Sequence, residues 1–473
     1  MACLIYFLAT GAYWQDFRLS REGMREDIVS RDVLSFRDRG VAPWPELEAV
    51  LHRALAKGPA ERFPSLGALA EALAAVEAPQ TSDGSSTREG PLAQILARAL
   101  SHAAPDGRWS QALLSPAPST SLNYGSAGIA LGLLHIACRR KDADVLTLAD
   151  LWTRRAVSEI TREGAFHNAD IEITPDLVGE ASPYHSPSGV FAVGVLVGTA
   201  MADPLGAAEA LAAFVAAIRR PAAGLDLTLG RCSTMLGAAI VLDALLDNDF
   251  VDVALLKAFG ASALAEIWQA VEAKPHITDA DIDYVGIAHG WAGILYATLQ
   301  WCRVSGTPTP SSLERRLGEL ADLALPTGRG LEWPWLLHRS GEPMTMAGWC
   351  NGTCGYVFLW TLAHRLLGAS RYIELAEGAA WRSWEAAEPS PTLCCGLGGR
   401  AYALLNMYRH TADIVWLERA RSLAAHAARL ENASPEYSHS LYKGEFGLAV
   451  LAADLEEPDD ATMPFFEPLG YRI

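Results

Sequence analysis

Cysteine is scarce in this chain, with eight residues of this type among 473. So few thiols exclude a disulfide-built scaffold, which concentrates many cysteines in a short chain. Four of them lie inside apolar helical patterns, where a buried free thiol is the usual role: Cys3, Cys138, Cys232 and Cys302. We therefore expect a reducing compartment and a cytoplasmic location.

Positive charge and long apolar runs are also lacking. The formal net charge is −17, which argues against a nucleic-acid partner because phosphate binding requires a basic face. The longest uncharged apolar run, residues 190–202, is too short to cross a bilayer and ends at Asp203 and Pro204. The apolar start of the chain carries no basic segment typical of a signal peptide. We predict neither nucleic-acid binding nor a membrane span.

Ala, Leu and Arg are abundant, while β-branched residues are sparse, which favours an all-α fold. The length suggests more than one domain. Residues 1–77 read as a helical unit with helices at 2–10, 45–56 and 66–76, the last capped by Ser65. Residues 78–90, rich in Ser, Thr, Gly and Asp, read as a linker. Residues 91–473 form the second domain.

A glycine-marked turn that leads into an apolar helix recurs through this second domain. Five of the turns carry both glycines of G-x-x-G, and two keep only the second. The seven turns lie at 124–128, 186–189, 234–237, 289–293, 351–355, 395–399 and 443–447. Repeats of roughly this length are typical of arrays in which each unit packs on its neighbours.

The helices of the array alternate in character. Those that follow the glycine turns are apolar nearly all round and should be buried, whereas those between them are amphipathic and should cover the outside. Seven inner and seven outer helices predict an α/α toroid, with an open solenoid as the alternative. Seven helix N-termini would then converge on one end of the ring and make a concave mouth.

Three of the remaining cysteines lie at neighbouring turns. Cys350 precedes the fifth turn, and the adjacent Cys394 and Cys395 precede the sixth. Three thiolates bind Zn²⁺ well and leave a fourth tetrahedral position open. Buried thiols without a metal and a strained vicinal disulfide are the alternatives. Cys354, inside the fifth turn, is expected in the core, whereas His289, directly before the fourth turn, is expected to be catalytic.

The motifs AHGWAG, WCNGTCG and CCGLGG resemble the three signatures of LanC-type lanthionine cyclases, and the resemblance covers about residues 91–455. It implies an α/α toroid in which Cys350, Cys394 and Cys395 hold zinc. The zinc takes the substrate thiol as its fourth ligand and lowers its pKa. That thiolate adds to a dehydroalanine or dehydrobutyrine of the same dehydrated precursor peptide, and His289 protonates the enolate.

The chain departs from the family pattern at three places. Cys395 stands where most members have histidine, and we expect the third thiolate to make the bound substrate thiolate more nucleophilic and the enzyme more permissive. Residues 345–347 hold no arginine at the family's basic position. Ser182 lies near the family's aspartate, and neither Asp170 nor Asp176 is assigned to that role.

Residues 1–77 resemble the end of a Ser/Thr protein kinase C-lobe, through ACLIYFLATG and ALAKGPAERFPSLGALAEAL. The glycine-rich loop, the β3 lysine, and the H-R-D and D-F-G motifs are absent, so no kinase activity is expected. A kinase followed by a cyclase resembles the class III and class IV lanthipeptide synthetases. The chain is therefore expected to be the end of a longer kinase-bearing protein, or to act with separate lyase and kinase enzymes.

Two further functions are consistent with the same residues. One is the addition of glutathione to dehydroamino acids, and another is a scaffold of this fold that binds a peptide without chemistry. An α/α-toroid glycosidase is disfavoured because no mouth position supplies a matching pair of carboxylates.

Overall fold

The computed structural model describes residues 1–469 apart from 11–12, 16–20, 37–38, 40–43, 77–89, 112–113, 115, 223, 249, 280–281, 339–342, 388–389 and 431–437. The chain divides into two compact units, Met1–Arg88 and Glu89–Ile473. Nearly all of the predicted linker at 78–90 lies outside the described residues.

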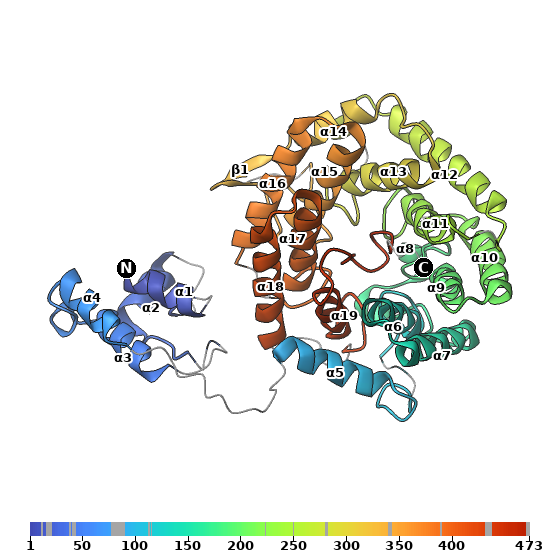
Figure 1. Ribbon diagram of the computed structural model, residues 1–473. Coiled ribbons are helices and arrows are strands. Elements are labelled where there is room, and N and C mark those ends of the chain that lie inside the picture. Colours follow the sequence, from blue (N-terminus) through green and yellow to red (C-terminus); the bar gives the residue numbers. More distant parts are fainter. Residues whose placement is uncertain are drawn as a thin grey trace. The chain divides into compact units, whose positions relative to one another are not determined.

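The first unit is a small helical bundle, drawn in blue in Figure 1. Its helices are α1 (Ala2–Thr10), α2 (Arg21–Ser30), α3 (Pro45–Ala54), η1 (Pro59–Glu61) and α4 (Leu66–Ala74). Tyr6, Phe36 and Leu51 form the centre of its core. The predicted cap of α4 is confirmed, because the Ser65 hydroxyl accepts the backbone N–H of Ala68 at 3.1 Å.

The second unit consists of two concentric rings of helices (Figure 1). The inner helices are α6 (Ser126–Arg140), α9 (Pro187–Ala200), α11 (Arg231–Leu245), α13 (Trp291–Ser305), α15 (Thr353–Leu367), α17 (Leu397–Thr411) and α19 (Phe446–Asp454). The outer helices are α5 (Pro91–Ala103), α7 (Ala143–Glu159), α10 (Pro204–Ile218), α12 (Ala254–Glu272), α14 (Leu313–Ala321), α16 (Ser370–Glu385) and α18 (Ile414–Arg429). Each outer helix packs on at least one inner helix, and α5 covers α19. The predicted α/α toroid is confirmed.

Short elements complete the loops. They are η2 (Ala169–Ile171), α8 (Pro175–Val178), η3 (Ile277–Asp279) and the antiparallel strands β1 (Leu325–Thr327) and β2 (Gly330–Glu332). The strands pack on α16. Among the described residues no helix is long and apolar enough to cross a membrane.

The inner ring closes on itself. Each inner helix contacts the next, and α19 contacts α6. At the mouth, hydrogen bonds also join neighbouring loops. At five turns the donor lies two residues before the glycine that precedes the inner helix. Backbone N–H groups of Asn123, Thr228, Ala288, Cys350 and Cys394 donate to the carbonyls of Tyr184, Ala288, Cys350, Cys394 and Tyr442, respectively. The hydroxyls of Ser182 and Ser440 complete the circle through the carbonyls of Thr228 and Asn123.

The third turn lies earlier than the sequence pattern predicts. Helix α11 begins at Arg231, directly after Gly230, so the expected turn at 234–237 is wrong. Gly237 lies inside the helix, where an added Cβ would be 3.0 Å from the Pro183 side chain and 3.4 Å from Phe214. It serves close packing rather than a turn, and the true third turn retains only the first glycine of the motif.

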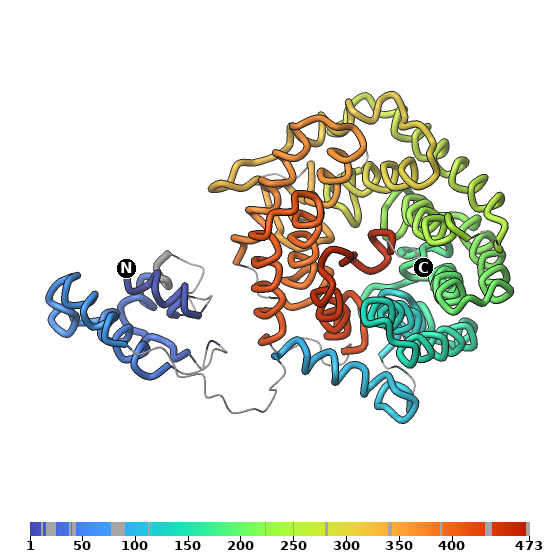
Figure 2. The backbone as a smooth tube through the Cα atoms, viewed as in Figure 1, coloured from blue at the N-terminus to red at the C-terminus, as the bar shows by residue number. Residues whose placement is uncertain are grey.

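The last described part of the chain runs into the middle of the ring (Figure 2). Met463, Phe465 and Phe466 are buried there. The hydroxyls of Tyr184 and Tyr296, from the second turn and from α13, donate to the carbonyls of Phe465 and Phe466 at 2.9 and 3.1 Å. The segment thus occupies the centre of the ring, where tyrosine hydroxyls satisfy two of its backbone carbonyls.

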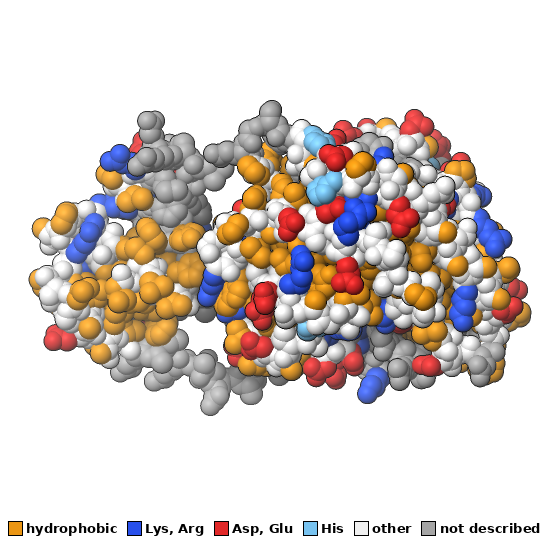
Figure 3. All heavy atoms as spheres, turned by 90° about the horizontal axis from the view of Figure 1, so that it is seen from above, with side chains coloured by type: hydrophobic (Ala, Val, Ile, Leu, Met, Phe, Trp, Pro, Cys, Tyr) orange, Lys and Arg blue, Asp and Glu red, His pale blue; other side chains and the backbone are white. Residues whose placement is uncertain are grey.

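Acidic, basic and apolar side chains alternate over the visible face of the ring unit in Figure 3, without a broad basic region on that face. This surface agrees with the net charge of −17.

Candidate metal centre and catalytic residues

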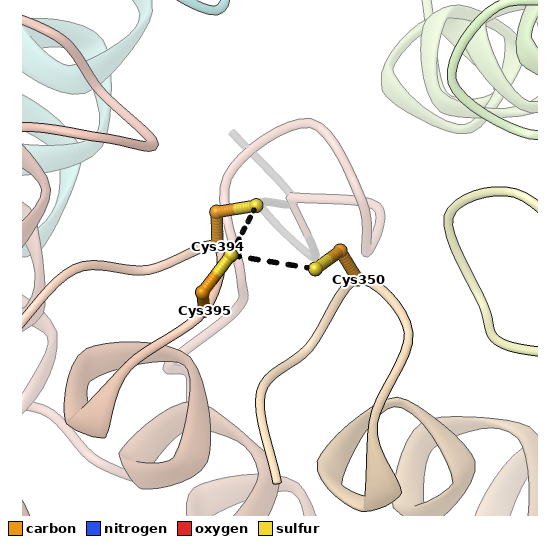
Figure 4. Close-up of side chains that lie close together, drawn as sticks. All are labelled: Cys350, Cys394 and Cys395. Atoms are coloured by element: carbon orange, nitrogen blue, oxygen red, sulfur yellow. Dashed lines mark hydrogen bonds between the residues drawn. The ribbon is translucent and has the colours of Figure 1, made fainter. Parts of the chain in front are cut away.

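Three cysteine sulfurs converge at the mouth of the ring (Figure 4). Cys350 comes from the loop before α15, and Cys394 and Cys395 come from the loop before α17. The Sγ atoms of Cys350 and Cys395 are 3.4 Å apart, as are those of Cys395 and Cys394. All three lie within 4.8 Å of one another. The structure therefore brings together the three predicted ligands, and none of them forms a disulfide.

A glycine permits the two cysteine loops to approach this closely. A Cβ atom at Gly348 would lie 2.7 Å from the Cα of Cys395, a distance that real side chains do not reach. The backbone N–H of Cys350 can then donate to the carbonyl of Cys394 at 3.2 Å. Cys354, by contrast, is fully buried in α15, as predicted.

The pKa values of the three thiols are shifted in different directions. Hydrogen bonds from the thiols of Cys350 and Cys395 lower the pKa of Cys394 well below its ordinary value. The same bonding raises the pKa of Cys350. The Lys443 ammonium lies 3.6 Å from the Cys395 Sγ, and the adjacent Cys394 thiolate raises the pKa of this lysine. A cation therefore faces the sulfurs from the seventh turn.

This sulfur arrangement fits zinc. A tetrahedral Zn²⁺ with Zn–S bonds of about 2.3 Å separates its sulfurs by roughly 3.8 Å. Two of the observed spacings, at 3.4 Å, are slightly shorter, and all three sulfurs lie within 4.8 Å of one another. Three thiolate donors from two loops also suit a soft, four-coordinate ion with one open position. Cys350 and Cys394 are 7% and 8% exposed, so the site is shielded but not sealed.

His289 forms a dyad with a carboxylate that the sequence analysis did not assign. Its Nδ1 lies 2.7 Å from the Asp226 Oδ2 and 3.2 Å from the Thr228 hydroxyl. The other carboxylate oxygen, Oδ1, accepts the backbone N–H groups of Thr228 and Leu229 at 2.6 and 2.8 Å. The carboxylate is thus fixed by its own loop and orients the imidazole, leaving Nε2 for a substrate.

The misplaced third turn explains why Asp226 was missed. Asp226 lies four residues before Gly230, in the loop that reaches the mouth. With the turn set at 234–237, the same aspartate falls outside the mouth loop. Ser182, near the family's aspartate position, instead donates its hydroxyl to the carbonyl of Thr228 and joins two loops. The signal that could have found Asp226 is the single glycine before Arg231.

The residue directly before the first glycine of a turn, or before the residue in its place, carries a candidate functional group at several turns. His289, Cys395 and Lys443 hold this position at three turns, and Tyr124 and His185 hold it at two others. The His185 ring centroid lies 6.4 Å from that of Tyr124. His185 is only 4% exposed, and its buried Nδ1 has no hydrogen-bond partner among the described residues. Burial lowers the pKa of His185 to about 4, so it is neutral at pH 7.

Aromatic side chains flank His289. The Tyr284 ring lies 6.1 Å from the imidazole, and Trp335 packs edge-on against Tyr284 at 6.2 Å. The backbone N–H of Ala288 donates to the carbonyl of Cys350 at 2.7 Å, which joins the histidine loop directly to the first cysteine loop. A candidate general acid–base group and a candidate metal centre thus lie on adjoining loops.

Fold and site together define a helical toroid with a thiolate centre and a histidine–aspartate dyad at its mouth. The family described as Lanthionine synthetase C-like protein matches residues 116–467, and the chain belongs to this family. The solved structure of a nisin cyclase has the same fold, with a TM-score of 0.59 over 77% of this chain and 93% of that one, at 12% sequence identity.

Curated relatives match a shorter stretch. The chain is 30% identical over 200 residues to "Glutathione S-transferase LANCL1" of Danio rerio, covering 39% of this chain and 46% of that protein. It is 27% identical over 192 residues to "LanC-like protein GCL1" of Arabidopsis thaliana, covering 38% and 43%. The chain thus spans less than half the length of the curated relatives it matches.

Proposed function

We propose that the ring unit catalyses zinc-dependent addition of a peptide cysteine thiol to a dehydroalanine or dehydrobutyrine, closing a (methyl)lanthionine thioether in a ribosomal peptide. The observation that carries the proposal is the convergence of three cysteine sulfurs on one point, beside a loop that presents the His289–Asp226 dyad. Membership of the family supports the same reaction class.

Cys350, Cys394 and Cys395 would hold the zinc. When bound, the metal lowers the pKa of the substrate thiol so that it reacts as a thiolate at neutral pH. A third thiolate adds negative charge to the centre, and Lys443, 3.6 Å from the Cys395 Sγ, partly offsets it. Lys443 thereby supplies a basic group at the mouth, although residues 345–347 lack the family's arginine.

His289 moves the proton. With Nδ1–H directed at Asp226, its Nε2 accepts the proton that the substrate thiol loses. The sulfur adds to the β-carbon, the Cα–Cβ double bond becomes an enolate, and Nε2 returns the proton to the α-carbon. The reaction consumes and releases no net proton. Asp226 does not exchange a proton in this scheme; it stabilises the imidazolium between the two transfers.

Metal analysis tests the centre. The purified full chain should hold about one equivalent of zinc, measured by plasma mass spectrometry. The double variant Cys350→Ala/Cys394→Ala should lose nearly all of it, whereas the control Cys354→Ala, a buried thiol of α15 outside the cluster, should retain it. Full zinc content in the double variant would contradict the assignment of these cysteines as the zinc ligands.

Glutathione addition is the second candidate, because one relative carries the printed name of a glutathione transferase. A dehydrated peptide with internal cysteines, incubated with and without glutathione, separates the two. Cyclisation leaves the mass unchanged and removes titratable thiols, whereas glutathione addition raises the mass by one tripeptide per site. If zinc is bound but neither product forms, a peptide-binding scaffold becomes the better description.

The first unit is proposed to be part of a kinase C-lobe that has no phosphotransfer activity by itself, so that dehydration of the peptide requires lyase and kinase activities from outside residues 1–473. Incubation of the full chain with ATP and a serine-containing precursor peptide should leave the peptide unphosphorylated. Phosphate transfer in that assay would contradict the assignment.

A further inference from the structure

A cavity of about 250 Å³ lies at the end of the ring opposite the cysteines. Arg303, Arg365 and Arg409 line it, and each lies near the C-terminal end of an inner helix: α13, α15 and α17, respectively. The cysteines and His289 precede the N-termini of these same helices. Helices of fifteen residues span about 20 Å at 1.5 Å per residue, so the cavity is separate from the mouth.

Two of the three arginines are neutralised within the cavity. Arg303 donates to the Asp243 carboxylate at 3.0 Å, and Arg409 donates to the Glu467 carboxylate at 2.5 Å. Glu467 also accepts from the Asn406 amide at 2.8 Å. These contacts position the guanidinium groups and use up the charge of both carboxylates.

The third arginine is not neutralised. Arg365 forms no hydrogen bond or ion pair with another described residue, although it lies between two other cations at the cavity. Partial burial lowers the pKa of Arg365 and the charge of Arg409 lowers it further, whereas Glu467 raises it. A guanidinium carries five donors, and this side chain is exposed, so it offers an unused cationic fork to whatever enters the cavity.

Two buried polar atoms of the lining are also unsatisfied. Thr462 is only 4% exposed, and its Oγ1 has no hydrogen-bond partner within the described chain. The Nε of Arg409 is buried and unpartnered as well. Buried polar groups without partners are rare because each one costs free energy. A donor hydroxyl, an N–H and a free guanidinium on one cavity call for an acceptor-rich group.

Acidic residues at the cavity limit the charge of the ligand that can carry this acceptor group. Asp459 and Asp460 also line the cavity, on the loop after α19, and both are exposed. They repel a polyanion at the rim, whereas a single oxyanion near Arg365 remains favourable. The volume accommodates a small organic molecule and excludes a folded peptide.

We infer that this cavity is a ligand site for a small molecule with one carboxylate or phosphate group, held by Arg365 and Thr462 and independent of the thiol chemistry. The oxyanion pairs with the guanidinium, as carboxylates and phosphates commonly do, and accepts a hydrogen bond from the threonine hydroxyl. Nothing in the proposed cyclase reaction uses this site.

Ligand-observed NMR on the full zinc-loaded chain tests the inference, with propionate and inorganic phosphate as probes and propionamide as the uncharged match. Saturable binding of propionate, phosphate or both is expected, without binding of propionamide. Binding of only one of the two anions assigns the oxyanion as carboxylate or phosphate.

Three variants locate the site. Arg365→Gln should weaken binding by at least about tenfold and Thr462→Val by a smaller factor. Arg154→Gln, on the 74% exposed arginine of α7, should leave binding unchanged. Arg365 makes no internal contact that folding requires, so an unchanged melting temperature is expected for its variant. Absence of saturable binding below roughly 100 mM, equal binding of propionamide, or anion binding that survives Arg365→Gln would each overturn the inference.

Discussion

Replacing Asp226 by asparagine isolates the orienting function of the carboxylate. The Asn side chain keeps an acceptor oxygen for the backbone N–H groups of Thr228 and Leu229, which now bond to Oδ1 at 2.6 and 2.8 Å. It replaces Oδ2, 2.7 Å from the His289 Nδ1, with an amide N–H₂. The loop is therefore preserved, while the histidine faces a donor and must present its lone pair at Nδ1.

The expected decrease in cyclisation rate follows from the loss of the Asp226–His289 hydrogen bond. A hydrogen bond to a charged partner contributes about 1.5–3 kcal/mol, so cyclisation should slow by roughly 10- to 150-fold at 1.4 kcal/mol per tenfold. The side chains of His289 and Asp226 are 33% and 18% exposed, which favours the lower half of that range because solvent screens the pair. The wrong tautomer adds to the loss, since Nε2 then carries the proton that it should accept.

Single-turnover cyclisation of a dehydrated peptide measures the rate, with zinc content and melting temperature measured on the same preparation. The matched control is Asp243→Asn, which breaks a 3.0 Å contact with Arg303 at the far end of α11 and should leave the rate unchanged. Wild-type rates in Asp226→Asn, together with an inactive His289→Asn variant, would refute the orienting role. Loss of zinc in Asp226→Asn would instead make the aspartate part of the metal centre.

Three further outcomes follow from packing, burial and ligand chemistry. The pKa of His185 is about 4 in the fold and about 6.5 when unfolded, so the stability of the wild type falls as pH drops from 6.5 towards 4. In urea titrations, the difference in unfolding free energy between His185→Gln and wild type should therefore shift by about 2 kcal/mol in favour of the variant from pH 7.5 to pH 5. A difference that does not change with pH would contradict the burial of this histidine. Gly260→Ala places a Cβ 2.0 Å from the Trp301 ring and should lower the unfolding free energy by about 1–3 kcal/mol. The control Gly318→Ala, whose Cβ has its nearest neighbour 3.9 Å away, should leave the unfolding free energy unchanged or raise it by up to about 1 kcal/mol. Equal shifts in melting temperature for the two variants would contradict this packing. Cys395→His should retain zinc and narrow the range of peptides that are cyclised in parallel assays. An unchanged range would contradict the hypothesis that the third thiolate makes the enzyme permissive.

Much of the candidate site could be predicted because its signals are local. Cys350, Cys394, Cys395 and His289 each stand beside a glycine turn that opens an inner helix, and adjacency to such a turn specifies which end of the ring a side chain occupies. The glycines themselves are explained by close approach, as at Gly348, where any Cβ would collide with the neighbouring loop.

Contacts between distant loops could not be read in this way. Lys443 reaches Cys395 from the next turn, and Asp226 reaches His289 across 63 positions. Gly237, which looks like a turn glycine, is required instead for packing inside α11. A single glycine can mark either a turn or a site of close helix packing, and only its neighbours in space show which role it has.

The sequence by itself therefore determined an α/α toroid, its seven-fold order, and the three cysteines and one histidine of the candidate site, because hydrophobic periodicity and turn chemistry act over a few residues. Only the tertiary structure decided the closure of the loop ring, the Asp226–His289 dyad and the placement of the C-terminal segment. It also decided the arginine-lined cavity opposite the mouth. These features depend on pairing between segments far apart in the chain, which no local pattern encodes.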